Sequence, residues 1–166
     1  MAEDLSDATA LVTGGSRGIG RATVKRLAET GARVAFTYRS SSDAAEELRA
    51  ELEEAGTEVL VFQGDVAEKQ SAEEAVEGVL EAWDRLDVLV NNAGIARDGL
   101  LLRLKEEDWD QVIETNLKSV FNFCQAAYRP MMGQREGAII NISSVVGEMG
   151  NPGQTNYAAS KAGIIG

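Results

Sequence analysis

Five short apolar runs, separated by longer stretches with helical spacing, constrain the fold of this chain more than any other feature. The runs occupy residues 8–12, 33–38, 58–62, 87–90 and 138–142. They are continuous rather than alternating, which is typical of strands buried on both faces. Strands that alternate with helices predict βαβ units and a parallel sheet, and right-handed crossovers place helices on both of its faces. We therefore expect an α/β fold with about five strands.

The first run leads into a glycine-rich turn. Residues 13–20 read Thr-Gly-Gly-Ser-Arg-Gly-Ile-Gly, and a helix-like stretch follows them. A turn of this kind lets a pyrophosphate approach the backbone closely and points a helix N-terminus at it. The glycine positions depart from the general G-x-G-x-x-G spacing, and a glycine cluster can also be a simple tight turn. The strand before it and the helix after it favour a nucleotide-binding loop.

Tyr157 and Lys161 form a candidate pair for acid–base chemistry. Residues four apart lie on the same face of a helix, so these side chains would be neighbours. A free phenol has a pKa of about 10, and a nearby ammonium lowers it toward the range in which a phenol transfers protons at neutral pH. Both residue types are also common on solvated helix faces. The chain has no histidine, which excludes imidazole chemistry and His-ligated metal sites, so we expect this pair to act and no metal to bind.

Together with three further motifs, these patterns make the chain resemble the short-chain dehydrogenase/reductase family. The glycine turn matches the family's T-G-x-x-x-G-x-G, and Tyr157 with Lys161 matches its Y-x-x-x-K. Residues 91–94 read Asn-Asn-Ala-Gly, as in the family's N-N-A-G, and Asn116 matches its helix asparagine. Ser144 precedes Tyr157 by thirteen residues, where the family carries its catalytic serine.

The resemblance covers residues 8–166 and implies a Rossmann-type, doubly wound parallel sheet. It predicts a single NADP-binding domain over residues 1–166, which is the N-terminal portion of the family's domain. The chain stops at Gly166, where the family continues into further strands and a substrate-covering segment. We therefore expect an exposed edge after the fifth strand, and a chain that is weakly active or inactive alone.

The resemblance also implies catalytic roles. Tyr157 would protonate a carbonyl oxygen as hydride arrives, and Lys161 would tune the phenol and bind the nicotinamide ribose. Ser144 would hold the substrate oxygen, and Asn116 would anchor a water that links Lys161 to solvent. Each residue taken alone has a structural alternative: a strand cap for Ser144, a bond to a helix carbonyl for Asn116, and a solvated charge for Lys161.

Cofactor contacts follow from the same resemblance. They are predicted in the glycine turn and after the second, third and fourth strands, at Gly14, Ser16, Arg17, Gly18, Ile19, Gly20, Arg39, Asp65, Val66, Asn92, Ala93 and Gly94, with Tyr157 and Lys161 at the nicotinamide. Asn91 either lines the cofactor or ties strands together, and both roles are compatible.

The end of the second strand predicts which nicotinamide cofactor binds. Residues 37–41 read Thr-Tyr-Arg-Ser-Ser, with no acidic residue before Asp43. An acid here would bond a ribose 2′-hydroxyl, whereas an arginine accommodates a 2′-phosphate. Arg39 and Arg17 could both reach that phosphate, so we predict NADP(H).

Local patterns are most similar to the 3-oxoacyl-acyl-carrier-protein reductases of type II fatty-acid synthesis. They lie at residues 91–101, 129–132, 142–147 and 150–154. Acetoacetyl-CoA reductases share them. The family resemblance is also compatible with a dehydrogenase of small alcohols, sugars or steroids, and with a nucleotide-binding fragment that has no turnover.

An acidic carrier protein needs a basic patch for docking, because this chain is itself acidic with a net charge of −11. The resemblance points to Arg135, and Arg129 is a second candidate. The alternative for both is a favourable charge near a helix C-terminus. The same acidity argues against nucleic-acid binding.

No apolar run approaches the length of a membrane span, and the one cysteine, Cys124, excludes an internal disulfide. We read Cys124 as a core residue and expect a cytoplasmic protein.

Residues 108–132 predict one long helix whose apolar face includes Phe121 and Tyr128 and is buried on more than one side. The family often packs this helix against a partner subunit, which implies a homo-oligomer, a tetramer in the family.

Overall fold

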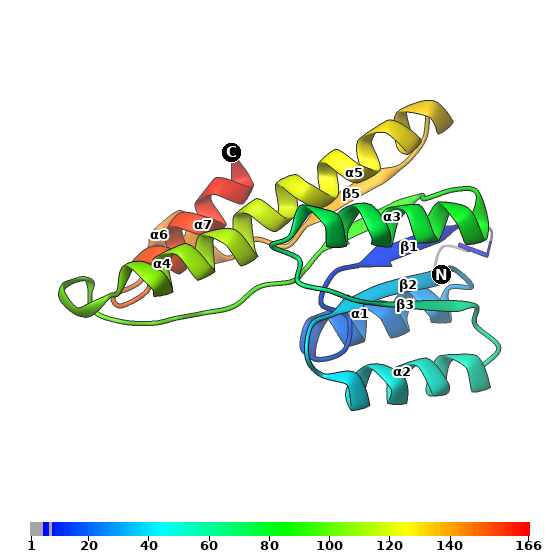
Figure 1. Ribbon diagram of the computed structural model, residues 1–166, viewed down its shortest axis with the longest axis horizontal. Helices are drawn as coiled ribbons and strands as arrows, with labels where there is room; N and C mark the ends of the chain where they lie inside the picture. Colours follow the sequence, from blue (N-terminus) through cyan, green and yellow to red (C-terminus); the bar gives the residue numbers. More distant parts are fainter. Residues whose placement is uncertain (1–4, 7) are drawn as a thin grey trace.

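The structure, a computed structural model, describes residues 5, 6 and 8–166, with helices on both faces of a central sheet (Figure 1). In this part of the chain, five parallel strands lie in the order β3-β2-β1-β4-β5. They are β1 (Thr9–Val12), β2 (Arg33–Tyr38), β3 (Val59–Gln63), β4 (Val88–Asn91) and β5 (Ala138–Asn141). Each strand lies within one residue of its predicted run, and the expected Rossmann-type α/β fold is confirmed. Residues 1–4 and 7 of the expected domain lie outside the described residues.

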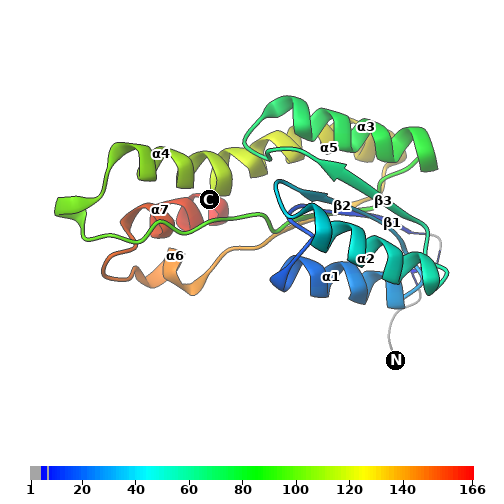
Figure 2. The same ribbon diagram turned by 60° about the horizontal axis from the view of Figure 1, so that its bottom comes forward.

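Two pairs of helices cover the sheet. One face carries α1 (Gly18–Glu29) and α2 (Ser42–Glu54), and the other carries α3 (Lys69–Trp83) and α5 (Ser119–Gln134) (Figures 1 and 2). One end of the molecule is built from the 3₁₀ turn Leu101–Arg103, α4 (Glu106–Ile113), α6 (Val145–Met149) and α7 (Thr155–Ile165). None of the helices in the described part of the chain has the length and hydropathy that a membrane span requires.

The two faces of the sheet have separate apolar cores, because successive strand residues point to opposite sides. On one side, Leu11 packs in a cluster with α3 and with Phe123 of α5. On the other side, Val12 and Phe36 pack with Leu48 of α2. All of these side chains are fully buried, and burial of such a side chain contributes about 1.5–3 kcal/mol to stability.

The winding of the sheet reverses between β1 and β4. The chain moves outward from β1 through β2 to β3, and then returns to the opposite side of β1 with β4. Parallel sheets form a crevice at the carboxyl ends of the strands where the order reverses. The glycine turn after β1 and the segment after β4 therefore meet at this crevice.

The prediction that all five strands are buried on both faces is wrong for β5. Ile139 is 39% exposed and Ile140 is 47% exposed. Within the described residues β5 pairs with β4 alone, so it is one of the two edge strands of the sheet, and the expectation of an exposed edge after the fifth strand fits it.

The prediction of one long helix over residues 108–132 is confirmed in its extent, because helical residues run without a break from Glu106 to Gln134. A π-helical segment, Glu114–Lys118, separates α4 from α5. The buried stripe of this helix differs from the predicted one, because Phe123 and Ala127 face the sheet while Phe121 and Tyr128 are 62% and 61% exposed. In a helix that is apolar on most sides, periodicity alone cannot identify the side that meets the sheet.

Cys124 lies beside that buried stripe and is only half-buried, so its assignment to the core is correct in part. Burial raises the pKa of its thiol above the ordinary value, against a smaller opposing effect of the Asn91 amide. A raised pKa keeps the thiol protonated and unreactive.

Candidate active site

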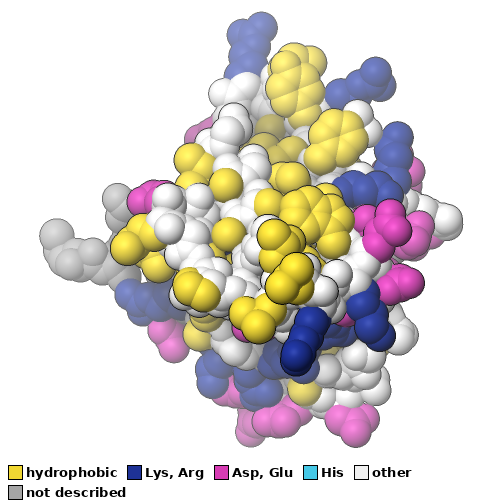
Figure 3. Space-filling view, turned by 90° about the vertical axis from the view of Figure 1, so that its left-hand side faces the viewer, with side chains coloured by type: hydrophobic (Ala, Val, Ile, Leu, Met, Phe, Trp, Pro, Cys, Tyr) yellow, Lys and Arg dark blue, Asp and Glu magenta, His cyan; other side chains and the backbone are white. Residues whose placement is uncertain are grey.

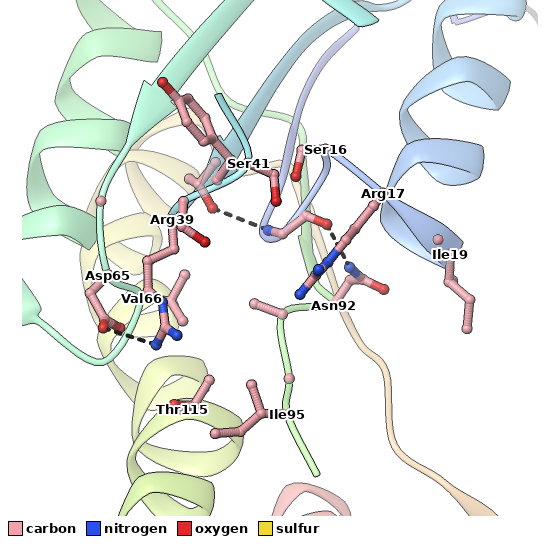
Figure 4. Close-up of a pocket in the computed structure, with 18 residues that line it drawn as sticks. Ser16, Arg17, Ile19, Arg39, Ser41, Asp65, Val66, Asn92, Ile95 and Thr115 are labelled. Atoms are coloured by element: carbon pink, nitrogen blue, oxygen red, sulfur yellow. Dashed lines mark hydrogen bonds and ion pairs between the residues drawn. The ribbon is translucent and has the colours of Figure 1, made fainter. Parts of the chain in front are cut away.

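A pocket of about 350 Å³ lies at the reversal of the sheet, at the carboxyl ends of its strands (Figure 4). Most of the predicted cofactor contacts line it: Gly14, Ser16, Arg17, Gly18, Ile19, Arg39, Asp65, Val66, Asn92, Ala93 and Gly94. The structure therefore brings together residues from separate stretches of the sequence. The roles of these residues stay predictions.

Gly20 does not line the pocket, and its requirement for glycine has a different cause. A Cβ atom on Gly20 would overlap the carbonyl oxygen of Gly14 and would lie 2.5 Å from the Asn92 side-chain nitrogen. Gly14 itself has a φ of +66°, and a Cβ on it would lie 3.1 Å from the Ala93 Cα. The glycine turn thus packs against the segment after β4 so closely that side chains do not fit between them.

Threonine side chains, which the sequence reasoning missed, fix the turn to its neighbours. Thr13 Oγ1 accepts hydrogen bonds from the backbone N–H groups of Asn92 and Ala93, each 3.0 Å long. Thr37 Oγ1 accepts one from Gly14 N–H at 3.1 Å. Asn92 Nδ2 donates to the Thr13 carbonyl oxygen at 2.9 Å. These short polar residues at strand ends have no periodic signature that would single them out.

Two arginines enter the pocket from opposite sides (Figure 4). Arg17 is the residue before α1, whose first turn has no side-chain cap and so leaves its N–H groups available. Arg39 follows β2, and its guanidinium pairs with Asp65 at 3.4 Å. A helix N-terminus beside two guanidinium groups has the charge that a phosphate-containing ligand requires.

The predicted pair Tyr157 and Lys161 is adjacent on α7. Lys161 Nζ lies 5.8 Å from the centroid of the Tyr157 ring, and the lysine is 4% exposed. Its Nζ donates a 2.7 Å hydrogen bond to the carbonyl oxygen of Ile142. Burial lowers the pKa of the Lys161 ammonium below its ordinary value, because a charged group loses its hydration there. The structural alternative of a solvated charge at Lys161 is therefore wrong.

Gly94 is where the pocket meets this pair. It lines the pocket, and a Cβ atom on it would lie 3.8 Å from Lys161 Nζ and 3.3 Å from Asn116 Oδ1. The ammonium of Lys161, with the Tyr157 ring beside it, therefore stands at the end of the pocket rather than inside its lining.

Asn116 is fully buried in the π-helical segment. Its Oδ1 accepts from the Ile95 N–H at 2.8 Å, and its Nδ2 donates to the Ile95 carbonyl oxygen at 3.0 Å and to Ser160 Oγ at 3.1 Å. Single π-helical turns are frequent at functional sites. The water-anchoring role stays a prediction, and the side chain itself is engaged by these partners.

Ser144 precedes α6 as its N-cap. Its Oγ accepts a 3.2 Å hydrogen bond from Val146 N–H, so its hydroxyl hydrogen is still available to a substrate. The neighbouring Ser143 Oγ donates to the Lys161 carbonyl oxygen at 2.8 Å. The loop after β5 is thus bonded to the helix that carries Tyr157.

Comparisons with known proteins agree with these motifs. A family model described as short chain dehydrogenase matches residues 8–166. The 3-oxoacyl-(acyl-carrier-protein) reductase FabG of Staphylococcus epidermidis is 52% identical over 158 residues, which are 95% of this chain and 65% of that protein. The corresponding reductase of Synechocystis is 51% identical, over 98% of this chain and 66% of its own length. The FabG of Chlamydia trachomatis is 50% identical, over 98% and 65%. The chain thus spans just under two thirds of the length of these relatives.

Proposed function

The chain belongs to the short-chain dehydrogenase family, and on this premise we propose that it reduces the 3-oxo group of an acyl thioester with NADPH. The proposed natural substrate is a 3-oxoacyl chain on acyl carrier protein, which is the substrate that the names of the relatives describe, and the proposed process is fatty-acid synthesis. One observation carries the proposal. A buried lysine stands beside a tyrosine at the end of a pocket that has the charge to hold a dinucleotide.

The pocket fits a dinucleotide on the evidence of its own packing. The backbone of the glycine turn is open at Gly18, where a Cβ atom would meet nothing within 4 Å, so pyrophosphate would be held by N–H groups at the start of α1. Asp65 and Val66 would bound the adenine, and Asn92, Ala93 and Gly94 the central portion. When bound, the reduced nicotinamide supplies the hydride.

The chain itself supplies the proton. In the proposal, the Ser144 hydroxyl donates a hydrogen bond to the substrate carbonyl oxygen, and the Tyr157 hydroxyl transfers its proton to that oxygen. The resulting phenolate is stabilised by the ammonium of Lys161. The Ile142 carbonyl supports this arrangement, because its bond to Nζ holds the ammonium beside the ring.

NADP(H) rather than NAD(H) is the proposed cofactor, and Arg39 and Arg17 at the pocket support it. Planar guanidinium groups bind phosphate oxygens in a bidentate manner. No carboxylate follows β2 before Asp43 to repel a 2′-phosphate.

An apolar surface beside Ser144 and Tyr157 supports a substrate with an acyl chain. Figure 3 shows hydrophobic side chains gathered over the end of the molecule where α4, α6 and α7 lie. In this region Leu101, Leu102, Val145 and Met149 are at least 69% exposed, and apolar side chains that gather on a surface mark an interaction site.

Two further surfaces enter the proposal. Arg129 lies on α5 and Arg135 follows its last turn, and both are exposed. These two arginines would dock the acidic carrier protein.

Exposed Phe121, Tyr128 and Met132 on α5 support a homo-oligomer that covers this helix. Residues 1–166 are proposed to act as a single nucleotide-binding unit.

The test is oxidation of NADPH by the purified protein, first with acetoacetyl-CoA and then with acetoacetyl-carrier protein. Slow oxidation that requires the 3-oxo group and is faster with the carrier-protein substrate is expected, in keeping with the weak activity that the sequence predicts for residues 1–166 alone. Binding of NADPH without oxidation of either substrate would contradict the enzymatic proposal and favour a nucleotide-binding fragment.

A further inference from the structure

The backbone of Tyr157 is held on both sides by buried side chains of its own helix. Asn156 Oδ1 accepts a 2.8 Å hydrogen bond from the Tyr157 N–H, and Ser160 Oγ donates one of 2.8 Å to the Tyr157 carbonyl oxygen. Both side chains are fully buried. The N–H groups of a first helical turn have no partner within the helix, so Asn156 provides the acceptor that Tyr157 otherwise lacks.

The same two side chains also bind segments outside α7. Asn156 Nδ2 donates to the carbonyl oxygens of Arg97 and Asp108, at 3.0 and 3.2 Å. Ser160 Oγ accepts the 3.1 Å bond from Asn116 described above. The side chains that fix Tyr157 are thus themselves fixed by the loop after β4, by α4 and by the π-helical segment.

These contacts connect Tyr157 to the wall of the cofactor pocket. Ile95 lines the pocket (Figure 4), and Asn116 bonds both its N–H and its carbonyl oxygen. One route therefore runs from Ile95 through Asn116 and Ser160 to Tyr157, and another runs from the same loop at Arg97 through Asn156 to Tyr157.

We propose that Asn156 and Ser160 are positioning residues that lock the Tyr157 backbone to the pocket wall. This inference rests on the proposed function, because it assigns their purpose to proton transfer. Misplacement of a catalytic group by about 1 Å can reduce the rate of the chemical step about a hundredfold. Buried hydrogen bonds at both ends of one residue resist such a displacement.

The experiment compares Asn156→Ala and Ser160→Ala with the control Asn151→Ala. Asn151 is an exposed asparagine of the preceding loop whose amide bonds Gln154. We expect Asn156→Ala to lower kcat for NADPH oxidation with acetoacetyl-CoA by about tenfold to a hundredfold, and Ser160→Ala by about threefold to tenfold. KM for NADPH stays within about twofold, because neither side chain lines the pocket. Asn151→Ala leaves both constants unchanged.

Hydrogen exchange of the Tyr157 amide gives a second readout that needs no turnover. Exchange is expected to accelerate about tenfold or more in Asn156→Ala, which removes the acceptor, and to stay close to the wild-type rate in Asn151→Ala. A folded Asn156→Ala protein with unchanged exchange and unchanged kcat overturns the inference. If Asn156→Ala does not fold, the kcat of Ser160→Ala tests the inference instead. That variant should fold, because alanine is favoured in helices.

Failure of the proposed function has a different signature. A wild-type protein that does not oxidise NADPH at all refutes the function, while the exchange rate of the Tyr157 amide still supports or overturns the lock on its backbone.

Discussion

Arg39 and Asp65 form an ion pair 3.4 Å long that joins the segment after β2 to the segment after β3 at the pocket. The side chains are 57% and 38% exposed, and exposed pairs of this kind contribute about 0.2–1 kcal/mol. The protein therefore loses little stability when the Arg39 guanidinium leaves the Asp65 carboxylate to bind a phosphate, with which it forms charge-assisted hydrogen bonds.

The first prediction follows from this pair. Arg39→Ala is expected to raise KM for NADPH about tenfold, because it removes a charged partner of the 2′-phosphate, and to leave KM for NADH nearly unchanged. Steady-state kinetics with both cofactors measure it. Arg49→Ala, which removes an exposed arginine of α2 paired with Glu53, is the matched control. A wild-type preference for NADH would contradict the cofactor assignment.

The second prediction concerns the phenol. Tyr157→Phe is expected to reduce kcat by about 10²–10⁴-fold, because it removes the proton donor and leaves the ring. The melting temperature and the Kd for NADPH should stay close to wild type. Tyr128→Phe removes the hydroxyl of an exposed tyrosine on α5 and should have no effect. Normal turnover by Tyr157→Phe would remove the basis of the proposed mechanism.

The third prediction uses the lowered pKa of the Lys161 ammonium, which burial causes. Between this lowered pKa and the value of about 10.4 for an unfolded lysine, the unfolded state binds more protons than the folded state. The free energy of unfolding of the wild type, relative to Lys161→Met, should therefore rise with pH across that window and become constant above it. Denaturant unfolding at several pH values measures the difference. A relative stability that falls with rising pH would contradict the burial of the charge.

The fourth prediction tests the packing of the glycine turn. Gly20→Ala is expected to destabilise the protein by about 1–3 kcal/mol, because its methyl group would overlap the Gly14 carbonyl. NADPH binding should weaken with it. Gly133→Ala is the control, since a Cβ on that α5 glycine meets nothing within 4 Å and alanine is favoured in helices by about 0.8–1 kcal/mol. Thermal unfolding should separate the two variants, and equal stabilities would show that the turn has room to move.

The fifth prediction concerns carrier-protein docking. Arg135→Glu is expected to raise KM for acetoacetyl-carrier protein about tenfold through charge repulsion, and to leave KM for acetoacetyl-CoA unchanged. The effect should diminish as salt is added. Arg49→Glu, a charge reversal on α2, serves as the control. If both substrates respond equally to Arg135→Glu, the arginine acts on folding rather than docking.

The sequence predicted the sheet from local signals, because a buried parallel strand is a continuous apolar run, as at Arg33–Tyr38. Most of the pocket residues were predicted from the family resemblance, and the structure gives a physical reason for one of them, Gly14, whose backbone lies against Ala93. The exposure of β5 was missed because the apolar residues of an edge strand resemble those of a central one. Whether a neighbour covers it depends on topology rather than on composition.

The positioning residues were missed for a different reason. Asn156 and Ser160 are polar residues on a helix, so a solvated location is the ordinary expectation for both. Their burial follows from carbonyl groups of Arg97 and Asp108 and from the Asn116 amide, which reach α7 from distant parts of the chain. Only the assembled tertiary structure brings these partners together.

The π-helical segment Glu114–Lys118 sets the phase between the two halves of the helical rod that α4 and α5 form. If the same residues were wound as an ordinary α-helix, with no π turn, one half would rotate against the other by about 100°. Either the Asn116 amide would swing away from Ile95, or Phe123 and Ala127 would turn out of the core. The wider π turn thus lets one continuous helix direct the Asn116 amide toward Ile95 while Phe123 and Ala127 face the apolar core. A uniform 3.6-residue repeat would not place both sets of side chains on these sides.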